Sequence, residues 1–158
     1  MQDIRLLVKG NIGNVFVGGT LQNTSNAVDA GQIMASGKIG SVHVVGDING
    51  GAASYSGIDA GTGIGKVTVD GSVLGGTGFD SSAIIARYGN LGPVLIRGDA
   101  RAGNGFYSAA IQCYIQTDRL PVTPFVLVKS FDVYESATVV EAGRFSHRVG
   151  KVQCPTNP

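Results

Sequence analysis

The residues best suited to chemistry stand in one glycine-rich segment, Gly75-Gly76-Thr77-Gly78-Phe79-Asp80. This segment matches the first six positions of the calcium-binding nonapeptide GGxGxDxUx, in which turn carbonyls and the Asp carboxylate hold an ion shared between adjacent turns. Position eight, normally a large apolar residue, is Ser82, and the segment occurs once although such nonapeptides work in tandem. Asp80 is therefore the candidate ligand for Ca²⁺, and a glycine-rich corner loop is the favoured interpretation.

Other side chains that could support catalysis do not form a recognisable set. Two carboxylates for sugar chemistry must lie within roughly 5 to 9.5 Å of each other. Asp47 and Asp99 recur in one slot of the repeat described below, where hydrogen bonding at a corner is favoured, and Asp59 and Asp80 show no partner in the sequence. No Ser or Cys can be matched by spacing with a His and an Asp. We therefore assign no catalytic residue.

Composition excludes two broad classes of partner. The net charge is +1 and charged residues make up 15%, so the chain has no overall field to attract nucleic acid. It has no apolar stretch of about 18 residues that could span a membrane, and no leader resembling a signal peptide.

Cys113 and Cys154 fit one disulfide in an exported protein or two buried thiols in a cytosolic one.

A segment of about 26 residues recurs four times. Each copy opens with an apolar residue and Gly, continues with two apolar residues separated by one variable residue, and then has Gly, a small polar residue and an apolar residue. The alternation indicates a strand with one buried face, and the later Gly indicates a corner, where glycine can adopt positive φ. A second apolar strand follows. The copies start near Ile12, Ile39, Ile64 and Leu91.

These copies predict an all-β fold, a single-stranded parallel β-helix (β-solenoid) with about 26 residues per rung and an irregular C-terminal region. Residues 1–113 hold the repeats, and Ile4-Arg5-Leu6 resembles the second strand of a truncated preceding rung. Residues 114–158 are expected to be degenerate terminal rungs or a cap of the same domain. An uncapped end would expose unpaired backbone groups, which predicts possible end-to-end self-association.

Stacking places equivalent residues of successive rungs in columns. The Val and Ile slots should point inward, and the residue between them should point outward as the candidate binding surface, a column of Phe16, His43, Thr68 and Leu95. The second strands should provide another outward column, formed by Met34, Asp59, Ile85 and Gln112.

One copy of the repeat resembles the glycine-rich β-solenoid repeats of large bacterial surface or secreted, adhesin-like proteins. Its pattern is GxIGxVxVxGDxxGG from Gly37 to Gly51, followed by SGxIxA from Ser56 to Ala60. The resemblance covers roughly residues 7 to 113. It implies an extracellular scaffold or adhesive stalk, and it brings no catalytic residues. The regular rungs, the near-neutral charge and the lack of a catalytic set in the sequence favour a non-enzymatic structural or binding module of a surface or extracellular protein, which presents a ladder of side chains to a polysaccharide or a surface protein. The alternatives are a polysaccharide lyase or glycoside hydrolase, which rests on fold analogy, and a self-assembling filament unit.

Overall fold

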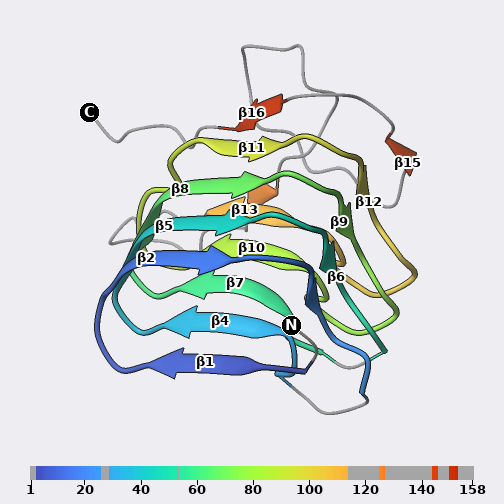
Figure 1. Cartoon of the computed structure of the whole chain (residues 1–158), viewed down its shortest axis with the longest axis horizontal. Helices are drawn as coiled ribbons and strands as arrows, with labels where there is room; N and C mark the ends of the chain where they lie inside the picture. Colours follow the sequence, from blue (N-terminus) through green and yellow to red (C-terminus); the bar gives the residue numbers. More distant parts are fainter. Residues whose placement is uncertain are drawn as a thin grey trace.

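The computed structural model describes residues 3–25, 29–52 and 54–113, together with three short strands beyond them at 125–126, 144–145 and 150–152. All regular secondary structure in these described residues is β-strand. The strands stack in successive turns of one coil, with β1 at one end of the stack and β11 and β13 near the other (Figure 1). The predicted all-β parallel solenoid is confirmed.

Each rung contributes three strands, and like strands of successive rungs form three faces. The first face has the order β16-β11-β8-β5-β2, the second β15-β12-β9-β6-β3, and the third β1-β4-β7-β10-β13-β14. The first-face strands are β2 (Ile12–Val17), β5 (Lys38–Val44), β8 (Gly63–Val69), β11 (Val94–Ile96) and β16 (Gly150–Val152). The second-face strands are β3 (Leu21–Gln22), β6 (Ile48–Asn49), β9 (Val73–Leu74), β12 (Ala100–Arg101) and β15 (Arg144–Phe145). The third-face strands are β1 (Arg5–Val8), β4 (Gln32–Ala35), β7 (Gly57–Ala60), β10 (Ala83–Ala86), β13 (Ile111–Cys113) and β14 (Phe125–Val126).

The register confirms the repeat and corrects its first copy. Ile12 pairs with Ile39, Ile39 with Ile64, and Ile64 with Leu91, so one rung spans 25 to 27 residues. β1 lies in the third face, as the resemblance of Ile4-Arg5-Leu6 to a second strand predicts. However, Leu6 rather than Ile4 pairs with Ile33. The second-face strands are only two residues long, and the sequence analysis treated them as part of the corner.

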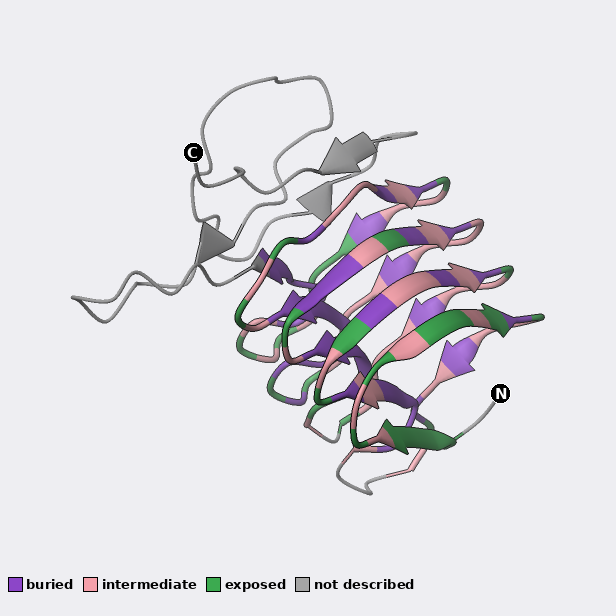
Figure 2. Cartoon of the chain, turned by 90° about the vertical axis from the view of Figure 1, so that its left-hand side faces the viewer, coloured by how far each residue is buried: buried purple, intermediate pink, exposed green. Residues whose placement is uncertain are grey.

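The inward slots form one continuous apolar core. Val42, Val67 and Val94 pair in consecutive rungs of the first face and are fully buried. Ile58, Ile84 and Ile111 do the same on the third face. Burial increases from the first rung inward, because β1 and β2 are largely exposed whereas β7 and β10 are buried throughout (Figure 2). The core is therefore a product of stacking, since no rung covers its own apolar face.

The second predicted column has the expected register, but its predicted exposure is wrong. Met34, Asp59, Ile85 and Gln112 occupy equivalent positions of four successive third-face strands. Only Met34 is partly exposed, and the other three are 1% to 5% exposed. The outward slots of the third face are thus buried in these rungs. Of the two predicted columns, only the first-face column is exposed to solvent.

Side chains at the corner between the first and second faces hold successive rungs together. Thr20 Oγ1 accepts a hydrogen bond from the Asp47 amide (3.2 Å), Asp47 Oδ1 from the Ser72 amide (2.7 Å), and Ser72 Oγ from the Asp99 amide (3.0 Å). Each bond joins one rung to the next. The corner hydrogen bonding favoured for this slot is present at Asp47, whereas at Asp99 only the backbone amide takes part and the carboxylate is paired with Arg101.

The glycine at this corner is required by space and not by positive φ, which corrects the sequence interpretation. Gly71 is not among the glycines with positive φ. A Cβ built on Gly71 would lie 2.7 Å from the carbonyl carbon and oxygen of Gly46 in the rung below. A side chain at Gly71 therefore collides with the preceding corner.

The three strands beyond residue 113 lie against the last rung in the opposite direction. β14 pairs antiparallel with β13, β15 with β12, and β16 with β11. Apart from these strands, residues 114–158 lie outside the described residues, so the expected degenerate terminal rungs or cap stay a prediction. The expected choice between a disulfide and free thiols for Cys113 and Cys154 lies outside the described side chains and stays a prediction.

Candidate functional site

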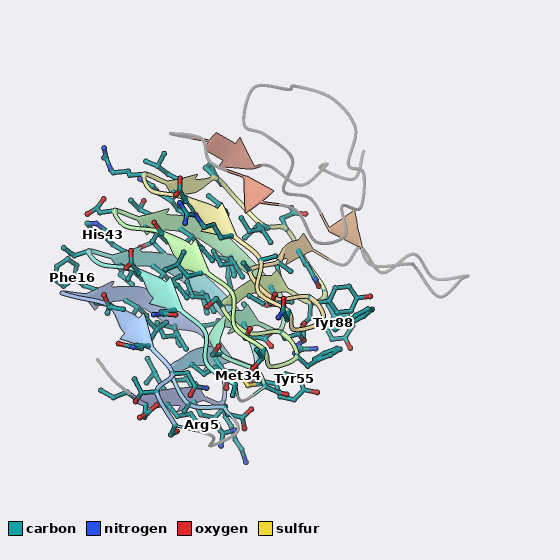
Figure 3. The ribbon with its side chains drawn as sticks, turned by 90° about the vertical axis from the view of Figure 1, so that its right-hand side faces the viewer. Arg5, Phe16, Met34, His43, Tyr55 and Tyr88 are labelled. Atoms are coloured by element: carbon teal, nitrogen blue, oxygen red, sulfur yellow. The ribbon has the colours of Figure 1, made fainter. Side chains whose placement is uncertain are left out.

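The predicted outward column is placed as expected on the first face. Phe16 pairs with His43, His43 with Thr68, and Thr68 with Leu95, each in consecutive strands. Phe16 is 67% exposed and the other three are partly exposed. The Phe16 and His43 rings meet edge to face, with centroids 5.4 Å apart. Figure 3 shows both residues on one side of the coil, away from Tyr55 and Tyr88. Binding by this column stays a prediction.

A charged row that the sequence analysis missed runs beside this column. His43 Nε2 donates to Asp70 Oδ2 at 2.8 Å, and Arg97 Nε donates to Asp70 Oδ1 at 3.0 Å. The hydrogen bond from His43 lowers the pKa of Asp70 below its usual value, and the charges of His43 and Arg97 act in the same direction. The three side chains come from three rungs, so a polar ligand on the first face would meet a fixed carboxylate between two donors.

Asp80, the candidate calcium ligand, lies in the corner loop before β10 and is almost completely buried. Its Oδ1 atom is buried without a hydrogen-bond partner. Burial raises the pKa of Asp80 to about 6, with nearby Arg87 lowering it and nearby Asp59 raising it. Among the described residues, no three His, Cys, Asp or Glu side chains gather as a metal site would need. Calcium binding at Asp80 stays a prediction that this geometry does not favour.

The partner of Asp59, invisible in the sequence, is Arg87 of the next rung. Arg87 Nε donates to both carboxylate oxygens of Asp59, at 2.9 and 3.0 Å. Asp59 is 5% exposed, so this ion pair neutralises a charge that would otherwise be costly to bury. Asp59, Asp80 and Arg87 thus form a small charge cluster in which the two acids are buried and Arg87 is partly exposed. The periodicity shows which rungs these residues occupy, but not that Arg87 reaches back by one rung.

The corner loops before the third-face strands share a rigid backbone. Ser81 Oγ accepts a hydrogen bond from the Gly76 amide (2.8 Å), and Ser108 Oγ accepts one from the Gly103 amide (2.9 Å). Each bond closes a loop five residues long at the same place in successive rungs. Positive φ also recurs, in Asp29, Tyr55, Asp80 and Tyr107, with values of 51° to 65°. The Gly75 to Asp80 segment is therefore one member of a family of equivalent corner loops.

These loops carry an aromatic cluster that the sequence analysis did not single out. We call it the aromatic corner, and it consists of Tyr55, Phe79, Phe106 and Tyr107. The Phe79 centroid lies 5.8 Å from that of Tyr55 in the rung before and 6.0 Å from that of Phe106 in the rung after. Tyr107 packs edge-on against Phe79 and Phe106. The signal in the sequence was the spacing of Phe79 and Phe106, which equals one rung.

The described residues contain no helix long and apolar enough to cross a membrane. No family model, curated protein or solved structure matches this chain. Its assignment therefore rests on its own geometry, which is that of a parallel β-solenoid of four complete rungs.

Proposed function

We propose that this chain is a non-enzymatic structural or binding module, a β-solenoid segment of a bacterial surface or extracellular protein. The observation that supports it is the first-face column, in which four successive rungs hold one outward side chain each in a fixed register. A row of side chains in fixed register presents evenly spaced contacts at little ordering cost, which suits a polysaccharide or an elongated protein partner.

Native gel electrophoresis through soluble polysaccharides tests this proposal. The panel comprises the neutral polymers hydroxyethylcellulose, xyloglucan and galactomannan, and the anionic polymer polygalacturonate. We expect at least one polymer to retard the wild-type chain. This retardation should be weaker for the Phe16→Ala and Leu95→Ala variants. Tyr88→Ala is the matched control, because Tyr88 is equally exposed but lies away from Phe16 (Figure 3). Retardation that is the same in all variants would refute the column as a polysaccharide-binding surface.

A polysaccharide lyase or glycoside hydrolase is the second candidate, and one observation favours it. Asp59, Asp80 and Arg87 bring two acids and a cation together, and the acids differ in environment, since Arg87 holds Asp59 while burial acts on Asp80. We rank this function second because both acids are less than one-tenth exposed. Release of reducing sugar from any polymer of the panel, abolished in Asp80→Asn, would reverse the ranking.

A further inference from the structure

The aromatic corner is an exposed row that follows the coil from rung to rung. Tyr55, Phe79 and Phe106 are 40%, 39% and 62% exposed. Backbone hydrogen bonds from the Tyr55 amide to the Phe79 carbonyl (2.8 Å) and from the Asp80 amide to the Phe106 carbonyl (3.0 Å) keep the three corner loops aligned. The rings consequently follow the stack from rung to rung on hydrogen-bonded loops, with Tyr55 in the slot of Asp80, one residue after the slot shared by Phe79 and Phe106.

The size of this row limits what can bind it. Aromatic side chains cover about 150 to 250 Å² each, so these fractions leave on the order of 300 Å² of ring surface accessible. A stable protein interface needs about 800 Å² from each partner. The cluster also has only four rings in all and lies at a corner rather than on a flat face. It therefore suits a narrow, linear ligand better than a folded protein.

The charge of the corner selects among linear ligands. The loop segments 75–80 and 102–107 contain one charged residue, Asp80, and it is buried. An anionic polymer would need free cations close to the rings, and the cation nearest to Phe106 in the sequence, Arg101, is paired with Asp99. Exposed polar groups are uncharged, and they include Thr77 and Asn104 beside the rings. The surface thus offers aromatic rings with hydroxyl and amide groups alongside.

The arrangement of the rings matches the surface of a sugar chain. A pyranose has C–H groups on its faces and hydroxyls around its rim, so it packs on an aromatic ring while its rim hydrogen-bonds to neighbouring polar groups. Phe79 and Phe106 are nearly parallel, 19° apart, with a centroid distance typical of an offset pair. Both side chains keep part of their surface accessible, since Phe79 is 39% and Phe106 62% exposed. Successive rungs can then receive successive sugars along the coil axis.

We propose that the aromatic corner is a binding site for neutral polysaccharide chains, separate from the first-face column. It uses different residues on a different part of the coil, and it holds whether or not the column binds a partner. Phe106 is the most exposed ring and Phe79 the central one, so these two side chains provide most of the contact.

The same native gels test this site, with the three neutral polymers as probes and polygalacturonate as the anionic comparison. We expect retardation by a neutral polymer, and we expect Phe106→Ala to raise the polymer concentration needed for half-maximal retardation about tenfold, as loss of a well-packed aromatic contact does. Phe79→Leu, which keeps apolar volume but removes the ring, should act in the same direction. Thermal melting establishes that each variant is folded, and Phe106→Leu replaces Phe106→Ala if the latter melts early.

Each outcome decides between the two surfaces. Loss of retardation in the Phe106 and Phe79 variants supports the corner site. If neutral-polymer retardation is unchanged in both, or if no neutral polymer retards the wild-type chain, the corner site is refuted, even where polygalacturonate retards it. Phe16→Ala, at an equally exposed ring on the first face, reports on the column alone. Loss in Phe16→Ala with full retention in Phe106→Ala would leave the proposed function standing and overturn the corner site.

Discussion

Replacing Asp80 by Asn should stabilise the protein near neutral pH. The pKa of Asp80 is raised from 3.8 to about 6 because the carboxyl is buried, and its Oδ1 atom has no hydrogen-bond partner. A group whose pKa is higher in the folded state binds its proton more tightly there. The contribution of Asp80 to the free energy of unfolding is therefore fully present below about pH 4, declines as the pH rises to about 6, and is lost above that pH.

The size of the effect follows from the pKa difference. About two pKa units at 1.36 kcal/mol each correspond to about 3 kcal/mol of stability lost above pH 6. Asn resembles the protonated carboxyl in shape and charge, and it tolerates the φ of 51° that Asp80 adopts. We therefore expect Asp80→Asn to match the wild type at pH 4 and to exceed it by up to about 3 kcal/mol at pH 7.

Urea denaturation followed by circular dichroism at several values between pH 4 and pH 8 measures this difference. Asp59→Asn is the matched control, because it makes the same chemical change in the same charge cluster. It weakens the bonds that Asp59 receives from Arg87, so we expect a loss of about 1 to 3 kcal/mol at pH 7. The reasoning fails if wild-type stability relative to Asp80→Asn is constant from pH 4 to pH 7, or if Asp80→Asn is the less stable protein at pH 7.

Three further predictions concern the coil itself. Gly71→Ala should lower the free energy of unfolding by about 1 to 3 kcal/mol because its Cβ meets the corner below. Gly19→Ala, in the same slot of the first rung with no atom within 4 Å, should lower it by less than about 1 kcal/mol. Equal losses in urea denaturation would contradict the close-approach argument. Ile84→Ala should cost about 2 to 5 kcal/mol as a fully buried core residue, and Thr68→Ala on the outward column less than about 1 kcal/mol. A loss at Thr68 as large as the loss at Ile84 would mean that Thr68 points into the core and not outward. Ser81→Ala removes the acceptor of the Gly76 amide and should lower the free energy of unfolding by about 1 to 2 kcal/mol. Hydrogen exchange at the Gly76 amide should become faster. Unchanged exchange there would contradict the prediction.

The sequence was sufficient for the features that repeat in every rung. The Val67, Val69 and Ile84 slots recur in each copy, so their strands, pairing and burial could be predicted from spacing alone. The outward position of Phe16 and His43 follows from the same alternation. These features depend only on local pattern and stacking, which one sequence contains in full.

What could not be predicted depends on contacts between different slots. Asp59 and Arg87 stand in different positions of their rungs, and no periodicity states that one side chain reaches the other. The burial of Ile85 likewise results from what covers the third face, because alternation indicates a second side of a strand but not whether that side meets solvent. The aromatic corner has a related origin, because its rings stand in loops, where neither strand alternation nor the Gly pattern indicates which side chains meet.

The direction of the terminal strands shows a stricter limit. Val149-Gly150-Lys151-Val152 has the spelling of a first-face strand, and β16 does lie on the first face, yet it runs antiparallel to β11. The alternation of a strand is the same when read in either direction. A sequence pattern can therefore identify the face on which a strand lies, but not whether the strand runs parallel or antiparallel to its neighbour. Along a rung the chain visits the first, second and third faces in that order, whereas β14, β15 and β16 visit the third, second and first. The three strands therefore follow the last rung in reverse, and each gives one face an antiparallel partner at the end where a further parallel rung would otherwise have to pair.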